Sequence, residues 1–290
     1  MFREYTKALF KRVDKRKLMQ FKPPTLPQRI YTKTLRIDQT HYEKFCKEVA
    51  WLESGRIHPL YLQMVSLPLQ MQCLLDKQSP FPLLGLIHSG NRVDVLSDYD
   101  ISEWFEFRVR FSDVTPHVRG WEVHVLLDVL QHGKLVYRAT SRFLVKVKAV
   151  HVAPYFTTTQ NQAECNIPFK SKIAEVCVAS DTGRRYAKLS HDYNPIHLTS
   201  LSAKVFGFKT AIAHGMWTLS RAISAFEAHR EEENTGAANY IDCQFKKPVS
   251  LPSSIDISQR SDNEKNMTVD VTGSKDNALH LTAFIRCGEA

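Results

Sequence analysis

Residues 186–219 contain the side chains best suited to proton transfer. Asp192, Asn194 and His197 lie within one short stretch, and Pro195 fixes the backbone between them. The Asp-Tyr-Asn-Pro sequence is typical of a turn, because Asp and Asn side chains bond to their own backbone. A carboxylate and an imidazole that share one water molecule form an acid–base pair. We therefore predict such a pair at Asp192 and His197. Their individual roles stay open, because proximity couples the two titrations.

The second candidate element is His214-Gly215-Met216, at the start of an expected helix. Backbone N–H groups in the first turn of a helix have no internal partner and lie at its positive end. Glycine allows a substrate to approach that backbone closely. A carbonyl polarised there would be stabilised as negative charge develops on its oxygen. Each of these features alone is usually only a turn, a cap or an ordinary histidine, but their combination favours a functional site.

The second half of the chain supplies the elements that position these residues. Residues 214–230 place Met216, Leu219, Ile223 and Phe226 at helical spacing, which predicts one buried helix. Strand-like segments follow it, with turn residues at Asp262–Asn263 and Asp276–Asn277 between them. These segments are residues 239–251, 254–261, 267–274 and 278–287.

The first half repeats the same order of elements. Residues 59–75 predict a helix with Leu60, Met64, Leu67 and Met71 on one side, and Pro68 is expected to kink or shorten it. A loose match between residues 41–46 and 185–190, ahead of the two helices, suggests a duplication. The strands expected after the first helix are Leu83–Leu96, Trp104–Phe111, Trp121–Leu130 and Lys134–Lys148.

A helix followed by an antiparallel meander, repeated twice, predicts an α+β protein with a double hot-dog fold. In this fold each long helix is wrapped by a curved sheet, and two sheets join edge to edge, which covers exposed strand edges. We expect a first half at residues 1–148, a polar linker at 149–172 and a second half at 173–290.

Length and composition limit the class of protein. A chain of 290 residues with 43% hydrophobic and 24% charged residues is ordinary for a globular protein of one or two domains. No segment approaches the roughly 20 apolar residues that cross a bilayer, so we expect no integral membrane association and a cytoplasmic location. The six cysteines have no Cys-x-x-Cys pair and no metal-ligand spacing. Cys73, Cys177 and Cys243 are expected in the core, and no metal is predicted.

Positive charge is concentrated at the beginning of the sequence, where residues 1–30 form a basic segment. Residues 1–22 contain eight Lys and Arg against Glu4 and Asp14. This segment is consistent with an amphipathic helix that has a solvated basic face. It also suits an anionic partner such as a carrier protein, CoA phosphates or a membrane surface. Nucleic acid is not expected, because no recognition motif accompanies the charge.

At this point a family resemblance becomes specific. Asp192-Tyr193-Asn194-Pro195-Ile196-His197, Gly207-Phe208 and Ile212-Ala213-His214-Gly215-Met216 together resemble the signature of the MaoC-like, hydratase-2 family. The resemblance implies that Asp192 and His197 are the catalytic pair, that Asn194 supports them and that the Gly215 N–H lies in an oxyanion hole. We also expect His214 and Met216, at the start of the expected helix, to be substrate-binding residues. Two departures are visible, since His191 replaces the usual glycine and Thr199 stands where an acidic residue is common.

The first half lacks the same machinery. Between residues 46 and 59 it has no room for an Asp-x-Asn-Pro-x-His loop, and Pro59, which has no N–H, matches the position of Gly215. In two-domain members such a non-catalytic half is thought to leave space for a long acyl chain. Met64 and Leu67 are our candidates for lining that space, although ordinary core packing explains each of them equally well.

The resemblance implies reversible hydration of trans-2-enoyl thioesters to (R)-3-hydroxyacyl thioesters, with CoA or acyl carrier protein as the carrier. No cofactor is expected, because the thioester itself serves as the electron sink. The alternatives are a hot-dog acyl-thioesterase and a non-catalytic acyl-thioester binding protein. The sequence leaves open a monomer or a homodimer.

Overall fold

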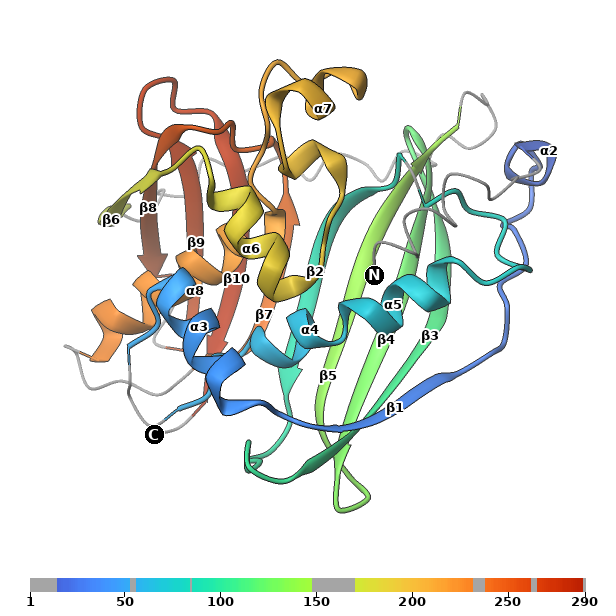
Figure 1. The fold of residues 1–290 in the computed structure, drawn as a ribbon, viewed down its shortest axis with the longest axis horizontal. Helices are drawn as coiled ribbons and strands as arrows, with labels where there is room; N and C mark the ends of the chain where they lie inside the picture. The colour runs from blue at the N-terminus through green and yellow to red at the C-terminus, as the bar shows by residue number, and fades with distance from the viewer. Residues whose placement is uncertain are drawn as a thin grey trace.

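The computed structural model describes residues 15–52, 56–83, 85–147, 170–231, 238–261 and 265–288. Their dominant feature is one ten-stranded antiparallel sheet with the order β1-β3-β4-β5-β2-β7-β10-β9-β8-β6. The first five strands in this order come from residues 31–146 and the other five from residues 171–287. Helices α3 to α6 lie in front of this sheet in Figure 1, and α7 projects at its top. The sheet and its helices form the double hot-dog architecture that the sequence predicts.

The strands of the first half bury alternate side chains. In β3, for example, Phe105, Phe107 and Val109 are fully buried and their neighbours are partly exposed. This alternation gives the sheet one apolar face for the helices to cover. The strands are β1 (Tyr31–Arg36), β2 (Ile87–Val95), β3 (Trp104–His117), β4 (Gly120–Gln131) and β5 (Lys134–Lys146).

The helical segment over this sheet is interrupted as expected. It divides at Ser66 into α4 (Tyr61–Val65) and α5 (Leu67–Leu74), and Pro68 lies in the first turn of α5. A proline does not destabilise a helix at this position, because a backbone N–H in the first turn would have no helical partner. An earlier helix, α3 (Gln39–Val49), begins at Asp38, whose side chain accepts hydrogen bonds from two backbone N–H groups.

The second half is built around one long helix, α8 (Gly215–Glu231). Its Leu219, Ile223 and Phe226 are fully buried, and Met216 packs at the edge of the same core. The predicted apolar stripe of this helix is therefore confirmed. The surrounding strands are β6 (Ser171–Val178), β7 (Ala238–Phe245), β8 (Ser253–Ser261), β9 (Asn266–Gly273) and β10 (Leu279–Cys287).

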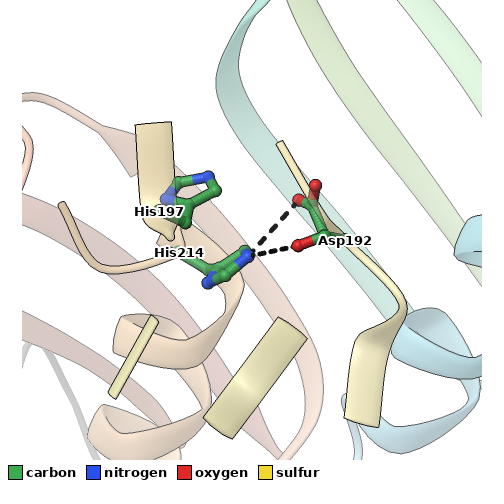
Figure 2. A group of neighbouring side chains, drawn as sticks. All are labelled: Asp192, His197 and His214. Carbon is green, nitrogen blue, oxygen red and sulfur yellow. Dashed lines mark hydrogen bonds and ion pairs between the residues drawn. The ribbon is translucent and has the colours of Figure 1, made fainter. Parts of the chain in front are cut away.

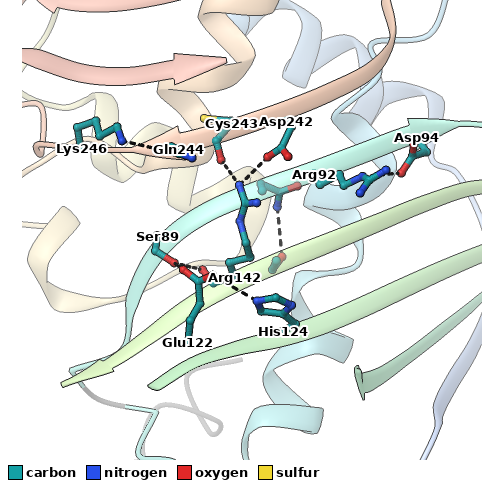
Figure 3. Close-up of polar contacts among 12 residues, drawn as sticks. Ser89, Arg92, Asp94, Glu122, His124, Arg142, Asp242, Cys243, Gln244 and Lys246 are labelled. Atoms are coloured by element: carbon teal, nitrogen blue, oxygen red, sulfur yellow. Dashed lines mark hydrogen bonds and ion pairs between the residues drawn. The ribbon is translucent and has the colours of Figure 1, made fainter. Parts of the chain in front are cut away.

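The two halves join where β2 pairs with β7, with Gly90 opposite Gln244. Arg142 of β5 reaches across β2, and its Nη2 donates to Asp242 Oδ1 at 2.6 Å and to the Cys243 carbonyl oxygen at 2.7 Å (Figure 3). A Cβ atom at Gly90 would lie 2.5 Å from Arg142 Nη2 and 2.6 Å from the Cys243 oxygen. Only glycine leaves room for this crossing, so Gly90 and Arg142 together fasten the joint.

Several predictions need correction or lie outside the description. The edge strands β1 and β6 were not among the expected strands, and β6 begins within the expected linker at 149–172, of which residues 149–169 lie outside the described residues. Of the basic segment at 1–30, residues 1–14 also lie outside them. The core prediction is wrong for Cys177, which is exposed, whereas Cys73 and Cys243 are buried. None of the described helices is both long and apolar enough to cross a membrane.

Candidate active site

The predicted loop lies between two helices of the second half. Helix α6 (Thr182–Ser190) ends at His191, and the chain then passes through the η2 turn (Pro195–His197) to α7 (Ser200–Val205). Asp192 Oδ1 accepts a hydrogen bond of 3.2 Å from the Asn194 N–H, and the Asn194 side chain accepts from the Ile196 N–H. The side-chain-to-backbone turn expected from the sequence is therefore confirmed, and it directs Asp192 and His197 from one compact segment.

The loop brings Asp192 and His197 together with His214 (Figure 2). One ligand atom of each of these residues lies within 4.8 Å of the others. Both histidines are buried, and Asp192 is partly exposed. Two acceptors that share a water molecule, each about 2.8 Å from its oxygen, are separated by a similar distance. An upper limit of 4.8 Å between Asp192 and His197 is compatible with one bridging water molecule.

The hydrogen bonds of His197 identify its tautomer. Its Nδ1 lies 2.8 Å from the backbone oxygen of Ile212, so Nδ1 carries the hydrogen and donates it. Burial lowers the pKa of His197, and the Asp192 carboxylate and the Ile212 carbonyl oppose that effect. The imidazole is therefore neutral near pH 7, with a lone pair on Nε2 that can accept a proton.

His214 connects the loop to the long helix. Its Nε2 lies 3.0 Å from the Asp192 backbone oxygen and 3.8 Å from Asp192 Oδ2. Its ring stacks on His197 with the centroids 3.7 Å apart and lies 5.1 Å from the Tyr186 ring. Burial, together with the adjacent His197, lowers the pKa of His214 to about 3. His214 is therefore neutral, and its Nε2 hydrogen is directed at the loop that carries Asp192.

Gly215 is the first residue of α8, as predicted. A Cβ atom there would lie 3.0 Å from the ring of Phe245. The absence of a side chain at Gly215 allows Phe245 to pack against the start of α8. This packing explains the glycine independently of any approach of a substrate. Met216 follows on the same helix, partly buried.

The two other sequence-predicted residues lie on the helices of the first half. Met64 is in α4 and almost fully buried, and Leu67 is the first residue of α5 and half-buried. Both positions suit core packing as well as an acyl-chain surface, so their proposed role stays a prediction.

Sequence reasoning missed several residues that shape this site. A Cβ atom at Gly183 would overlap the backbone oxygen of His197, so the η2 turn can approach α6 only at a glycine. The Ser190 hydroxyl accepts from the Asp192 N–H at 3.1 Å. His88, from β2 of the first half, is close enough for the Asp192 charge to act on its pKa. Gly183, in the first turn of α6, is a signal that the sequence could have provided, because a glycine allows close approach of another backbone.

A carboxylate with two imidazoles is also a donor set that zinc accepts. However, the rings of His197 and His214 are inclined by only 26° and stacked. Lone pairs lie in the ring plane, so two stacked rings direct them side by side rather than toward one point. The geometry suits hydrogen bonds to a small molecule better than tetrahedral coordination of a cation.

Comparison with known proteins identifies this part of the chain. Residues 160–279 match the family described as MaoC like domain, and this range includes Asp192, His197 and His214. The chain carries a MaoC-like domain. The resemblance seen in the Asp192–His197 and Ile212–Met216 segments is thereby confirmed.

The similarity extends beyond the MaoC-like domain. The chain is 27% identical over 263 residues to 3-hydroxyacyl-thioester dehydratase X of Mycobacterium tuberculosis, which covers 90% of each protein. The crystal structure of that protein, HtdX, matches with a TM-score of 0.74 over 90% of this chain and all of the other, at 23% identity. Peroxisomal multifunctional enzyme type 2 of Drosophila melanogaster is 24% identical over 200 residues, which are 66% of this chain and 32% of that protein.

The fold is also shared with proteins of a different named activity. An acyl-ACP thioesterase from Bacteroides thetaiotaomicron matches with a TM-score of 0.58 over 89% of this chain and 98% of the other, at 9% identity. The hot-dog fold therefore does not distinguish a dehydratase from a thioesterase, and that distinction must come from the side chains of the site.

Proposed function

We propose that this protein catalyses the reversible hydration of trans-2-enoyl thioesters and the dehydration of (R)-3-hydroxyacyl thioesters. The observation that carries the proposal is the pairing of Asp192 with a neutral His197 at a separation that one water molecule spans. The name of the Mycobacterium tuberculosis relative, a 3-hydroxyacyl-thioester dehydratase, supports the same reaction.

The geometry fits a water held by two acceptors. The Asp192 carboxylate and His197 Nε2 each accept one water hydrogen, which leaves an oxygen lone pair directed at the substrate. The water oxygen bonds to C3 while one of its protons passes to the acid–base pair. A proton from the pair bonds to C2, so the pair ends the reaction as it began. Dehydration follows the same steps in reverse.

The start of α8 suits the other end of the substrate. As a proton moves to or from C2, the thioester carbonyl takes on enolate character, and its oxygen gains negative charge. We assign that oxygen to the N–H of Gly215, at the positive end of a 17-residue helix. His214 acts one step away from the reaction, because it holds the loop that carries Asp192. Asn194 supports the same loop through its bond to the Ile196 N–H.

The proposed binding residues for the acyl chain and the two candidate carriers are those that the sequence suggests. Met64, Leu67 and Met216 are proposed to lie along the acyl chain, and CoA and acyl carrier protein remain the two carriers to test. The charge of +9 at pH 7 favours either, because both carriers are anionic. A monomer and a homodimer are both compatible with the proposal.

The test follows loss of ultraviolet absorbance at the enoyl-thioester band, with crotonyl-CoA, a longer 2-enoyl-CoA and an enoyl-carrier-protein substrate. We expect hydration to the (R)-3-hydroxyacyl product, and a decrease of roughly a hundredfold or more in Asp192→Asn and His197→Ala. Release of free thiol instead of hydration would identify a thioesterase. A folded protein that binds the thioesters but changes none of them would identify a binding protein.

A further inference from the structure

His88 brings a polar group of the first half to the border of the site. It lies near the start of β2, the strand that pairs with β7 at the joint between the halves. Its imidazole stacks on Phe143 of β5, with ring centroids 4.9 Å apart, and lies 5.0 Å from the ring of Phe245 in β7. The imidazole is therefore held between aromatic side chains that come from both halves.

Phe245 connects this imidazole to the proposed oxyanion site. The ring that lies near His88 is also 3.0 Å from the place that a Cβ atom of Gly215 would take. Phe245 is therefore next to both His88 and the first residue of α8. On the side of the acid–base pair, the Asp192 carboxylate is near enough to oppose the decrease in the His88 pKa, which burial lowers to about 4. His88 is thus neutral near pH 7 and adjacent to both parts of the site.

The Nε2 atom of His88 is the unusual feature. It is buried and has no hydrogen-bond partner among the described residues. Buried polar atoms in folded proteins are nearly always hydrogen-bonded, because an unmatched one loses its hydration without compensation. Phe143 and Phe245 offer it no such partner. A bound molecule that occupies the site during the reaction would supply one.

We propose that His88 binds the substrate through a hydrogen bond between its Nε2 and the oxygen atom on C3 of the (R)-3-hydroxyacyl thioester. In the hydration direction this oxygen comes from the attacking water, and the hydrogen that stays on it is donated to Nε2 as the other passes to the acid–base pair. This inference rests on the proposed function and gives the first half a role in it. His88 takes no proton in the reaction; it orients the oxygen that Asp192 and His197 act on.

The C3 oxygen fits better than the other polar atoms of the substrate. The thioester carbonyl already has a donor in the Gly215 N–H, to which it is assigned. The acyl chain has no polar atom to offer. The C3 oxygen is the atom on which the acid–base pair acts, and the Asp192 carboxylate of that pair is near enough to His88 to affect its pKa.

Two variants separate a hydrogen bond from a packing role. His88→Phe keeps an aromatic ring between Phe143 and Phe245 but removes the nitrogen. His88→Gln keeps a hydrogen-bonding group near the position of Nε2. Hydration of crotonyl-CoA and of octenoyl-CoA gives kcat and KM, with enoyl-carrier-protein used if only that substrate reacts. The inhibition constants of butanoyl-CoA and octanoyl-CoA report binding of a chain that lacks the C3 oxygen.

We expect His88→Phe to lower kcat/KM by about tenfold or more, as for loss of one buried hydrogen bond. The inhibition constants of the saturated thioesters should change by less than about twofold, and His88→Gln should recover most of the lost kcat/KM. Equal weakening of the saturated thioesters, or no change in kcat/KM, would overturn the inference while leaving the proposed function intact. Absence of hydration by the folded wild-type protein with every substrate would overturn both.

Discussion

The Nε2 atom of His214 donates a 3.0 Å hydrogen bond to the backbone oxygen of Asp192. This contact joins the residue before α8 to the loop after α6, so the proposed oxyanion site and the proposed acid–base pair are positioned by one side chain. The His197 ring stacks on the His214 imidazole, and the Tyr186 ring lies beside it.

His214→Phe should preserve the stacking but remove the bond to the Asp192 backbone. We expect kcat to decrease about tenfold to a hundredfold with little change in KM, because a displaced Asp192 affects the reaction more than binding. Steady-state kinetics on the enoyl thioester measure this. His214→Gln, which can donate to the same oxygen, should retain more activity than His214→Phe. Equal activity of His214→Phe and wild type would exclude a positioning role.

His191→Gly should stabilise the protein. His191 has φ 59° and ψ 20°, the left-handed conformation in which a Cβ atom is unfavourable. Relief of this strain is worth about 1 kcal/mol and should appear as a higher denaturation midpoint. His191→Ala is the matched control, since it removes the imidazole but keeps the Cβ atom. A similar gain in both variants would show that the side chain, and not the backbone conformation, is responsible.

Stability should decrease as the pH falls, partly through His58. This histidine is fully buried, its Nδ1 accepts from the Leu60 N–H and its Nε2 lies 3.2 Å from the Ser220 oxygen. Burial lowers its pKa from 6.5 to about 3. The unfolded chain therefore binds a proton below about pH 6.5 that the folded chain refuses until about pH 3. The contribution of His58 to stability is complete above pH 6.5 and decreases from there to about pH 3.

Urea unfolding of wild type and His58→Asn at pH 7.5 and pH 5.0 measures this contribution. Asparagine can accept from the Leu60 N–H but does not titrate. We expect the loss of unfolding free energy between the two pH values to be smaller in the variant by about 1–2 kcal/mol. An identical loss in both proteins would mean that His58 is protonated in the folded state.

Gly90→Ala should weaken the joint between the halves. The added Cβ atom would overlap both the Arg142 guanidinium and the Cys243 carbonyl. The guanidinium can move but the β7 backbone cannot do so without disturbing the β2–β7 pairing, so we expect a loss of about 1–3 kcal/mol in urea unfolding. Ser89→Ala, which removes a hydroxyl from the neighbouring residue and adds no atom, should cost less. A Gly90→Ala protein as stable as wild type would contradict this account.

Much of the fold was predictable because the long elements have strong patterns. The apolar stripe of α8 follows from residue spacing, and the interruption of the first-half helix near Pro68 follows from the presence of a proline. The edge strands β1 and β6 were not predicted, since most of their side chains are exposed or partly exposed and the alternation of apolar residues is weak there. Cys177 was misjudged for the same reason, because it lies on the exposed side of β6.

The candidate site was predictable where its residues are close in sequence and not where they come from different elements. The turn at Asp192 and Asn194 could be recognised from residue types whose side chains bond locally. The stacking of His197 on His214 depends on how the loop packs against α8. His88 comes from the other half through the β2–β7 pairing, and no local pattern records such a contact.

Because β2 and β7 pair within one chain, the joint between the halves does not depend on protein concentration. Two separate hot-dog chains that joined by these strands would come apart at low concentration, with loss of whatever the joint supports. Here the strands belong to one molecule, so each meets the other at an effective concentration that dilution does not alter. The activity of each molecule that depends on the joint, including any contribution of His88, should therefore be the same at picomolar as at micromolar protein.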